Sequence, residues 1–241
     1  MSAIRTVRDR ARAELTREIK NEARRQLAIE GANALSLRAV ARELGMVSSA
    51  LYRYFRNRDE LLTALIVDAY NALGEIAESA FAAVADTDVR GRWREVYRAV
   101  RAWARRHPHE YALIYGSPIP GYRAPQDTVT PASRVPLVLI GVLRDSWAAG
   151  TLRAGSGWPP PSTTLSAQIE RLATSVAPEL PGQVLARAVI VWTQLFGMLS
   201  FELFGQLVGS VDPSDDFFEH AIEQMADFVG LPADDAGDAG R

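Results

Sequence analysis

Residues 37–62 read LRAVARELGMVSSALYRYFRNRDELL, and this stretch decides the expected fold. It predicts two short helices, 37–44 and 48–54, that meet at a tight turn on Gly45. The second helix ends in an aromatic cluster, Tyr52, Tyr54 and Phe55, accompanied by a basic run, Arg53, Arg56 and Arg58. A helix-turn-helix of this kind places its second helix in the major groove of DNA, while flanking groups hold phosphates. The stretch therefore predicts sequence-specific binding to DNA.

The distribution of charge agrees with this prediction. Residues 1–58 carry 13 Lys and Arg against 6 Asp and Glu, a net charge of +7, whereas residues 59–241 carry 14 against 23, a net charge of −9. The overall formal charge of −2 thus combines a basic N-terminal part with an acidic remainder. Basic groups attract DNA through counterion release, and an acidic body is repelled from it.

The length of 241 residues suits one small module followed by a larger domain with its own core. The chain has no cysteine, which excludes disulfides, thiolate metal sites and cysteine catalysis. The first 20 residues lack the apolar centre of a signal peptide. The longest uncharged apolar stretch, 188–201, has 14 residues, fewer than the roughly 18–20 that span a bilayer. We therefore expect a soluble, cytoplasmic protein.

The rest of the chain also has helical periodicity, and no convincing strand alternation is present. Ser36 is the expected N-cap of the helix 37–44, and Asp212 with Pro213 is the expected start of the last helix. We predict an all-α fold with a three-helix DNA-binding domain (1–58), a larger helical domain (59–230) and a disordered tail (231–241). The expected helices are 7–30, 37–44, 48–54, one starting at 59, 90–106, 110–115, 132–149, 166–177, 182–204 and 213–229.

The stretch 37–62 closely resembles the N-terminal region of the tetracycline-repressor (TetR) family of bacterial transcriptional regulators. The residues that carry the resemblance are Ser36, Ala41, Gly45, Leu51, Tyr52, Tyr54, Phe55, Arg58, Glu60 and Leu61. Two positions depart from the family pattern. Tyr54 stands where the family has histidine, and Val47 stands where a hydroxyl side chain usually begins the recognition helix. Both departures affect which bases are read, and neither affects the fold.

Several side chains of this region are candidates for contact with DNA. We expect Tyr52 and Arg58 to hold phosphates, although a ring packed in the core is an alternative for Tyr52. Ser36 and Arg38 suit an anion site at a helix start, and capping alone is the alternative for Ser36. The residues expected near base edges are Ser48, Ser49, Ala50, Arg53 and Tyr54.

The arginines that precede this region have two interpretations. Arg5, Arg8, Arg10 and Arg12 either reach an adjacent groove of the DNA or are merely solvating charge. For Arg53, likewise, a solvated surface position is the alternative to base or phosphate contact. The sequence does not decide between these alternatives.

The resemblance implies a small-molecule pocket between helices of the larger domain, and such pockets are mostly apolar. The candidate lining residues are Trp103, Tyr111, Trp147, Trp192 and Phe196, with core packing as the alternative for each. The last two helices carry apolar residues on more than one face, which favours a partner surface. In the family such a pair forms a four-helix bundle in a homodimer, and a dimer predicts a palindromic operator. The candidate interface residues are Leu195, Met198, Leu199 and Leu203.

Other function classes have weaker support. The chain has three histidines and lacks both a G-x-S-x-G elbow and a Walker lysine, so we expect neither an enzyme nor a cofactor. His107, His109 and Glu110 have a spacing that could hold a metal, but they lie at an expected helix boundary, where polar residues are common, so no metal is predicted. A purely architectural DNA binder would not need the aromatic body. A small-molecule-binding or interaction protein with an incidental DNA-binding head remains the alternative.

Overall fold

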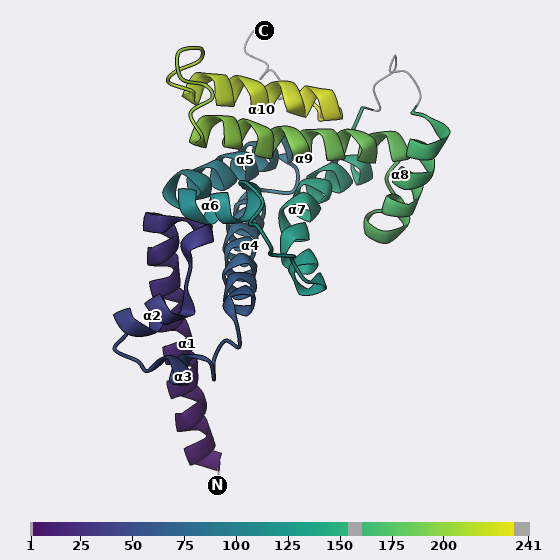
Figure 1. Cartoon of the computed structure of the whole chain (residues 1–241). Coiled ribbons are helices and arrows are strands. Elements are labelled where there is room, and N and C mark those ends of the chain that lie inside the picture. Colours follow the sequence, from purple (N-terminus) through teal and green to yellow (C-terminus); the bar gives the residue numbers. More distant parts are fainter. Residues whose placement is uncertain (1, 154–160, 234–241) are drawn as a thin grey trace. The chain divides into compact units, whose positions relative to one another are not determined.

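A computed structural model of the chain describes residues 2–153 and 161–233, with side chains from residue 7 onward. Within these ranges every regular element is a helix, which confirms the predicted all-α class (Figure 1). Two short 3-10 helices, η1 (Ala32–Ala34) and η2 (Gln126–Thr128), accompany the α-helices. These are α1 (Ser2–Glu30), α2 (Leu37–Glu43), α3 (Ser48–Leu51), α4 (Arg58–Ala83), α5 (Val89–Arg106), α6 (Pro108–Tyr115), α7 (Val129–Ala148), α8 (Thr163–Val176), α9 (Gly182–Leu203) and α10 (Asp215–Val229).

The chain divides into two compact units, and their boundaries differ from the expected one at residue 58. The first unit comprises Met1–Asn71 and His107–Pro131, and the second comprises Ala72–Arg106 and Ala132–Arg241. Helix α4 therefore contributes its first half to one unit and its second half to the other. The predicted disordered tail falls almost wholly on residues 234–241, outside the described residues.

The first unit is built on a three-helix core. Ile19 and Ala23, one turn apart on α1, are fully buried, and so is Leu51 of α3. Phe55, which follows α3, joins the same apolar cluster with 5% of its surface exposed. Between α2 and α3, Gly45 has a φ of +64°, a conformation that a residue with a Cβ adopts only with strain. The glycine thus permits the tight turn that the sequence predicts.

Helix α6 and the loop after it also belong to this first unit. Leu113 of α6, together with Ile119 and Tyr122 of the loop, packs against the core of the three helices. The Tyr122 hydroxyl lies 2.9 Å from Oγ1 of Thr63 on α4. These contacts join residues about 60 positions apart, so no local sequence pattern predicts them.

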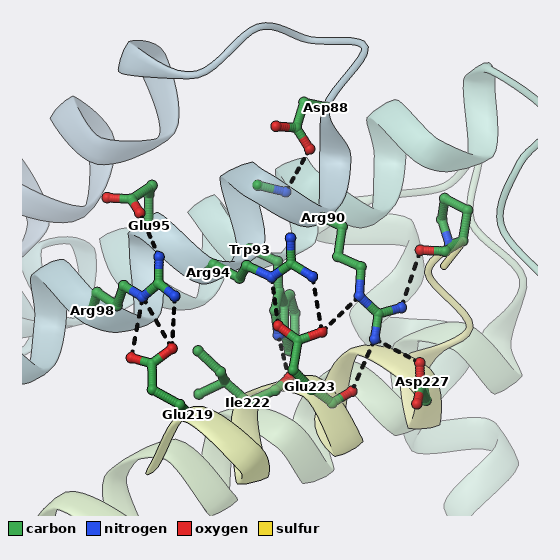
Figure 2. Close-up of polar contacts among 12 residues, drawn as sticks. Asp88, Arg90, Trp93, Arg94, Glu95, Arg98, Glu219, Ile222, Glu223 and Asp227 are labelled. Carbon is green, nitrogen blue, oxygen red and sulfur yellow. Dashed lines mark hydrogen bonds and ion pairs between the residues drawn. The ribbon is translucent and has the colours of Figure 1, made fainter. Parts of the chain in front are cut away.

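In the second unit, ion pairs join α5 to α10 along their lengths (Figure 2). Arg90 bonds Glu223 at 2.8 Å and Asp227 at 2.7 Å, and Arg98 bonds Glu219 at 2.7 Å. Arg94 shares Glu223 with Arg90. The hydrogen bond from Arg94, together with that from Arg90, lowers the pKa of the Glu223 carboxyl below its ordinary value. Burial acts in the opposite direction.

The same side of α5 continues with Arg101, which is 9% exposed and lies 2.9 Å from both Glu202 and Asp215. Arg105 also reaches Asp215, at 3.0 Å. Between the arginines, the Trp93 indole donates to the Ile222 carbonyl at 2.9 Å. Arginines three or four residues apart on α5 therefore meet carboxylates on α9 and α10, and they set the register between these helices.

The predicted start of the last helix needs a correction, whereas the predicted helix 182–204 agrees with α9 to within one residue. Helix α10 begins at Asp215 with Ser214 before it, whereas Pro213, predicted as the first helical residue, follows a cis peptide bond and precedes the helix. Helix α9 has 22 residues, longer than the uncharged stretch of 14, and is long and apolar enough to cross a membrane by length and composition alone. It packs instead as a core helix, with Val191 and Leu195 buried.

Replacing Arg101 by Ala tests a buried member of this ion-pair series. The carboxylate of Glu202, 13% exposed, loses its nearest cation, and removing one partner of such a buried pair costs about 3 kcal/mol of unfolding free energy. Arg98→Ala is the matched control, because the Arg98 side chain is 45% exposed and its pairs contribute about 1 kcal/mol or less. Urea unfolding of both variants measures the difference. Equal losses would show that burial does not distinguish the two pairs.

Candidate DNA-binding site

The recognition segment consists of the short helix α3 and the turn that follows it. α3 ends at Leu51, three residues before the predicted end, but Tyr54 still donates its amide to the Leu51 carbonyl at 2.8 Å. The buried side chains of Leu51 and Phe55 anchor this segment to the core. Between these two anchors, Tyr52 and Arg53 are exposed, whereas Tyr54 packs in part against the core.

The predicted base-reading residues all lie on the recognition segment but differ in exposure. Ser49 and Arg53 are exposed, whereas Ser48, Ala50 and Tyr54 are half-buried. Val47, before the helix, is 70% exposed and makes no capping hydrogen bond. Tyr52 is 42% exposed, so its ring is not part of the packed core.

A concavity of about 520 Å³ lies where the start of α2 meets the end of the recognition segment. Three of the residues predicted to hold phosphates line it. Ser36 and Arg38 come from the start of α2, and Tyr52 comes from the recognition segment. The Ser36 side chain makes no capping bond to α2, so capping does not account for it. Arg56, a member of the basic run that was assigned no individual role, also lines the concavity, and its side chain is 86% exposed.

Arg58 lines the same concavity but has a structural role that the sequence did not indicate. Its Nη2 donates to the Ala32 carbonyl at 2.7 Å, and its Nε donates to the Leu35 carbonyl at 3.2 Å. These bonds tie the start of α4 to the segment that leads into α2. The guanidinium predicted to hold a phosphate is therefore already engaged by main-chain oxygens.

The five predicted ligand-binding residues are not alike in exposure. Trp103, Tyr111 and Phe196 are buried, with at most 7% exposed, and Trp147 is 38% exposed. Tyr111 belongs to the first unit, where its ring lies tilted against that of Tyr115, with centroids 5.3 Å apart, whereas the other four belong to the second unit. The indole Nε1 of Trp192 is buried and has no hydrogen-bond partner among the described residues.

The predicted interface residues differ in the same way. Leu195 and Leu199 are fully buried within the chain itself, so they have no surface left for a partner, and Met198 and Leu203 are half-buried. The exposed apolar side of α9 is a different one. It carries Ile190, Phe201 and Phe204, each at least 45% exposed, with Gly197 between them.

The histidines near α6 have an ordinary structural explanation. His107 Nδ1 lies 3.1 Å from a Glu110 carboxylate oxygen, and the other oxygen of Glu110 lies 3.0 Å from Arg24 on α1. Within the ranges that the structure describes, no three His, Cys, Asp or Glu side chains are grouped to hold a metal ion.

Comparison with known proteins decides the family. Residues 19–65 match the family model for bacterial regulatory proteins of the tetR family, and residues 93–225 match the model for a tetracyclin repressor-like C-terminal domain. The chain belongs to the tetR family. HTH-type transcriptional regulators of Mycobacterium tuberculosis and Mycobacterium bovis are 39% identical to it over 201 residues, which cover 81% of this chain and 83% of theirs.

Solved structures agree with this membership. The crystal structure of SCO4313, described as a regulatory protein, is 36% identical, with a TM-score of 0.75 over 90% of this chain and 97% of that one. The tetR-family regulator PfmR of Thermus thermophilus shares the fold, with 19% identity and a TM-score of 0.54 over 88% of this chain and 96% of that one. The chain is thus a tetR-family transcriptional regulator and not an enzyme, as predicted, and the family is in general soluble and cytoplasmic.

Arg58→Ala tests the structural role of this arginine. The substitution leaves the carbonyls of Ala32 and Leu35 without their donor, which costs about 1–3 kcal/mol for buried acceptors and less for partly hydrated ones. We expect a loss of about 1 kcal/mol in urea unfolding. Arg56→Ala is the control, because it removes the same charge from an exposed side chain and should leave stability within about 0.5 kcal/mol. A stable Arg58→Ala protein that binds DNA poorly would instead favour phosphate contact.

Proposed function

We propose that this protein is a cytoplasmic repressor that binds a palindromic operator as a homodimer and is released by a small, largely apolar molecule. The observation that carries the proposal is the recognition surface. Ser49, Tyr52 and Arg53 are exposed on a short segment that is anchored by buried residues, and the concavity lined by Ser36, Arg38 and Tyr52 lies beside it.

The chemistry of this surface suits duplex DNA. An arginine side chain can bind guanine through O6 and N7. A serine hydroxyl can pair with either a donor or an acceptor on a base edge, and a small residue such as Ala50 fits against a thymine methyl group. Tyr52, Arg38 and Arg56 supply hydroxyl and guanidinium donors for phosphate oxygens around the concavity. We assign base reading to Ser48, Ser49, Ala50, Arg53 and Tyr54, and phosphate contact to Ser36, Arg38, Tyr52 and Arg56.

The dimer surface that we propose is the exposed side of α9. Ile190, Gly197, Phe201 and Phe204 are spaced by seven, four and three residues, so they lie on one face of the helix. A Cβ added at Gly197 would meet no atom within 4 Å, which leaves room for a partner helix to approach closely. Half-buried Met198, predicted from sequence, would contribute at the edge of this face, whereas Leu203 lies one turn after buried Leu199, on the other side of the helix.

For the effector, the second unit offers an apolar interior with at least one unused polar group. The buried N–H of Trp192 has no acceptor among the described residues, and leaving such a donor unpaired costs about 1–3 kcal/mol. This supports an effector that combines an apolar body with a hydrogen-bond acceptor. Because such a ligand binds only the folded state, it raises the melting temperature, which gives the measurement for screening.

Release from DNA requires the effector to favour one conformation over another. We propose that it binds the DNA-free conformation more tightly and displaces α4, which contributes residues to both units. Displacement of α4 would change the spacing of the two recognition segments in the dimer. A ligand with equal affinity for both conformations would have no effect.

Titration with the DNA that flanks its own gene, at two salt concentrations and against scrambled DNA, tests DNA binding. We expect salt-sensitive binding to the flanking DNA and weaker binding to the scrambled control.

Two variants test the assigned contacts in the same titration. Tyr52→Phe removes a phosphate donor and should weaken binding to every sequence alike. Arg53→Ala should relax the preference at one position, at a cost of about 1–3 kcal/mol for the preferred base. Wild-type affinity in both variants would contradict these assignments.

The dimer surface has its own test. Phe201→Glu places a charge in the middle of the proposed interface and should weaken dimerisation about a hundredfold, the equivalent of roughly 2.7 kcal/mol. Light scattering during size-exclusion chromatography over a range of concentrations measures this. Leu137→Glu on α7 is the control, because Leu137 is also an exposed apolar residue, 43% accessible, but lies outside α9. A Phe201→Glu protein that remains dimeric would place the interface elsewhere.

A further inference from the structure

The apolar stripe of α1 changes to arginine where the helix extends past the core. Along one face, Ile19 is fully buried and Leu15 is half-buried. The next two positions on the same face are Arg12 and Arg8, three and seven residues before Leu15, and both are exposed. The face that covers the core at one end of the helix is therefore cationic at the other.

Contacts of Arg12 locate this cationic end relative to the recognition segment. Its guanidinium carbon lies 5.4 Å from the centre of the Tyr54 ring, and its Nη2 lies 3.5 Å from the Arg53 carbonyl oxygen. Arg12 thus lies against the segment that we propose reads bases. Arg8 lies about one helical turn, roughly 6 Å, farther along the same face. Within the described residues Arg8 forms no ion pair with a carboxylate.

This part of α1 precedes the residues that match the N-terminal family model. The match begins at residue 19, whereas α1 begins at Ser2, so the arginines belong to helical turns that precede the matched pattern. A face of two exposed cations beside a proposed DNA-reading segment complements the phosphate backbone in charge, and binding there would release counterions.

We propose that Arg8 and Arg12 bind phosphates of the DNA that flanks the bases read by α3, and so lengthen the contact that each protomer makes with its operator. This rests on the proposed function, because the recognition segment must first bring the duplex to this side of α1. The occupant is double-stranded DNA. The contact is independent of sequence, since both groups meet the backbone.

The test uses the full-length protein and a duplex carrying the sequence that the wild type selects from a random library. In Arg8→Gln/Arg12→Gln, the slope of log K against log salt should fall by about 1.8 per bound protomer, or about 0.9 for each lost phosphate contact. When the salt concentration rises from about 50 to about 200 mM, the DNA affinity of the variant should therefore fall about twelvefold less per protomer than that of the wild type. Fluorescence anisotropy titrations measure both.

The matched control is Arg10→Gln/Arg17→Gln, which removes the same charge from exposed residues on the other side of α1. It should keep the wild-type slope. Arg8→Gln alone makes no change at the recognition segment and should lower the slope by about 0.9, which separates phosphate contact from a displaced Tyr54. A wild-type slope in both arginine variants, or equal losses in the control, would overturn the proposal. A wild type that selects no sequence would instead contradict the proposed function.

Discussion

The burial of Leu51 and Phe55 against α1 determines the rest of the candidate site. The recognition segment is too short to be stable by itself, because α3 closes only one turn. Its conformation therefore depends on two side chains packed in the same apolar cluster as Ile19 and Ala23. Those two anchors turn Tyr52 and Arg53 outward, and the left-handed conformation of Gly45 brings α2 beside them. Loss of this packing would disperse the donors that we assign to DNA.

A different kind of interaction organises the larger unit. Apolar burial is not directional, so it holds α5, α9 and α10 together without fixing how far one helix slides along another. The arginines of α5 fix the axial position of these helices relative to one another, because each arginine pairs with a particular carboxylate of α9 or α10. With α10 and α9 held in this way, Leu195 and Leu199 face inward and Phe201 faces outward. The surface proposed for dimerisation is the side of α9 that these neighbours leave exposed.

Much of the fold could be predicted from the sequence because its signals are local. The glycine turn, the three- and four-residue spacing of apolar side chains and the change from basic to acidic composition are all present within short windows. The predicted helices were therefore confirmed, apart from shifts at their ends such as Pro213. Residue roles were harder to predict. Arg58 has the sequence position of a phosphate ligand, but its guanidinium bonds to carbonyls more than 20 residues away.

The sequence by itself determined the helix-turn-helix, the all-α class and the tetR family, because periodicity, turn chemistry and motif residues are read along the chain. Only the tertiary structure decided which apolar residues of α9 are core and which are exposed, since a helix with more than one apolar face gives no indication of the side its neighbours will cover. It also decided that α6 packs with the DNA-binding helices and that Arg12 lies beside Tyr54. Those facts depend on contacts between distant segments, and the free energy of such contacts exists only once the chain has folded.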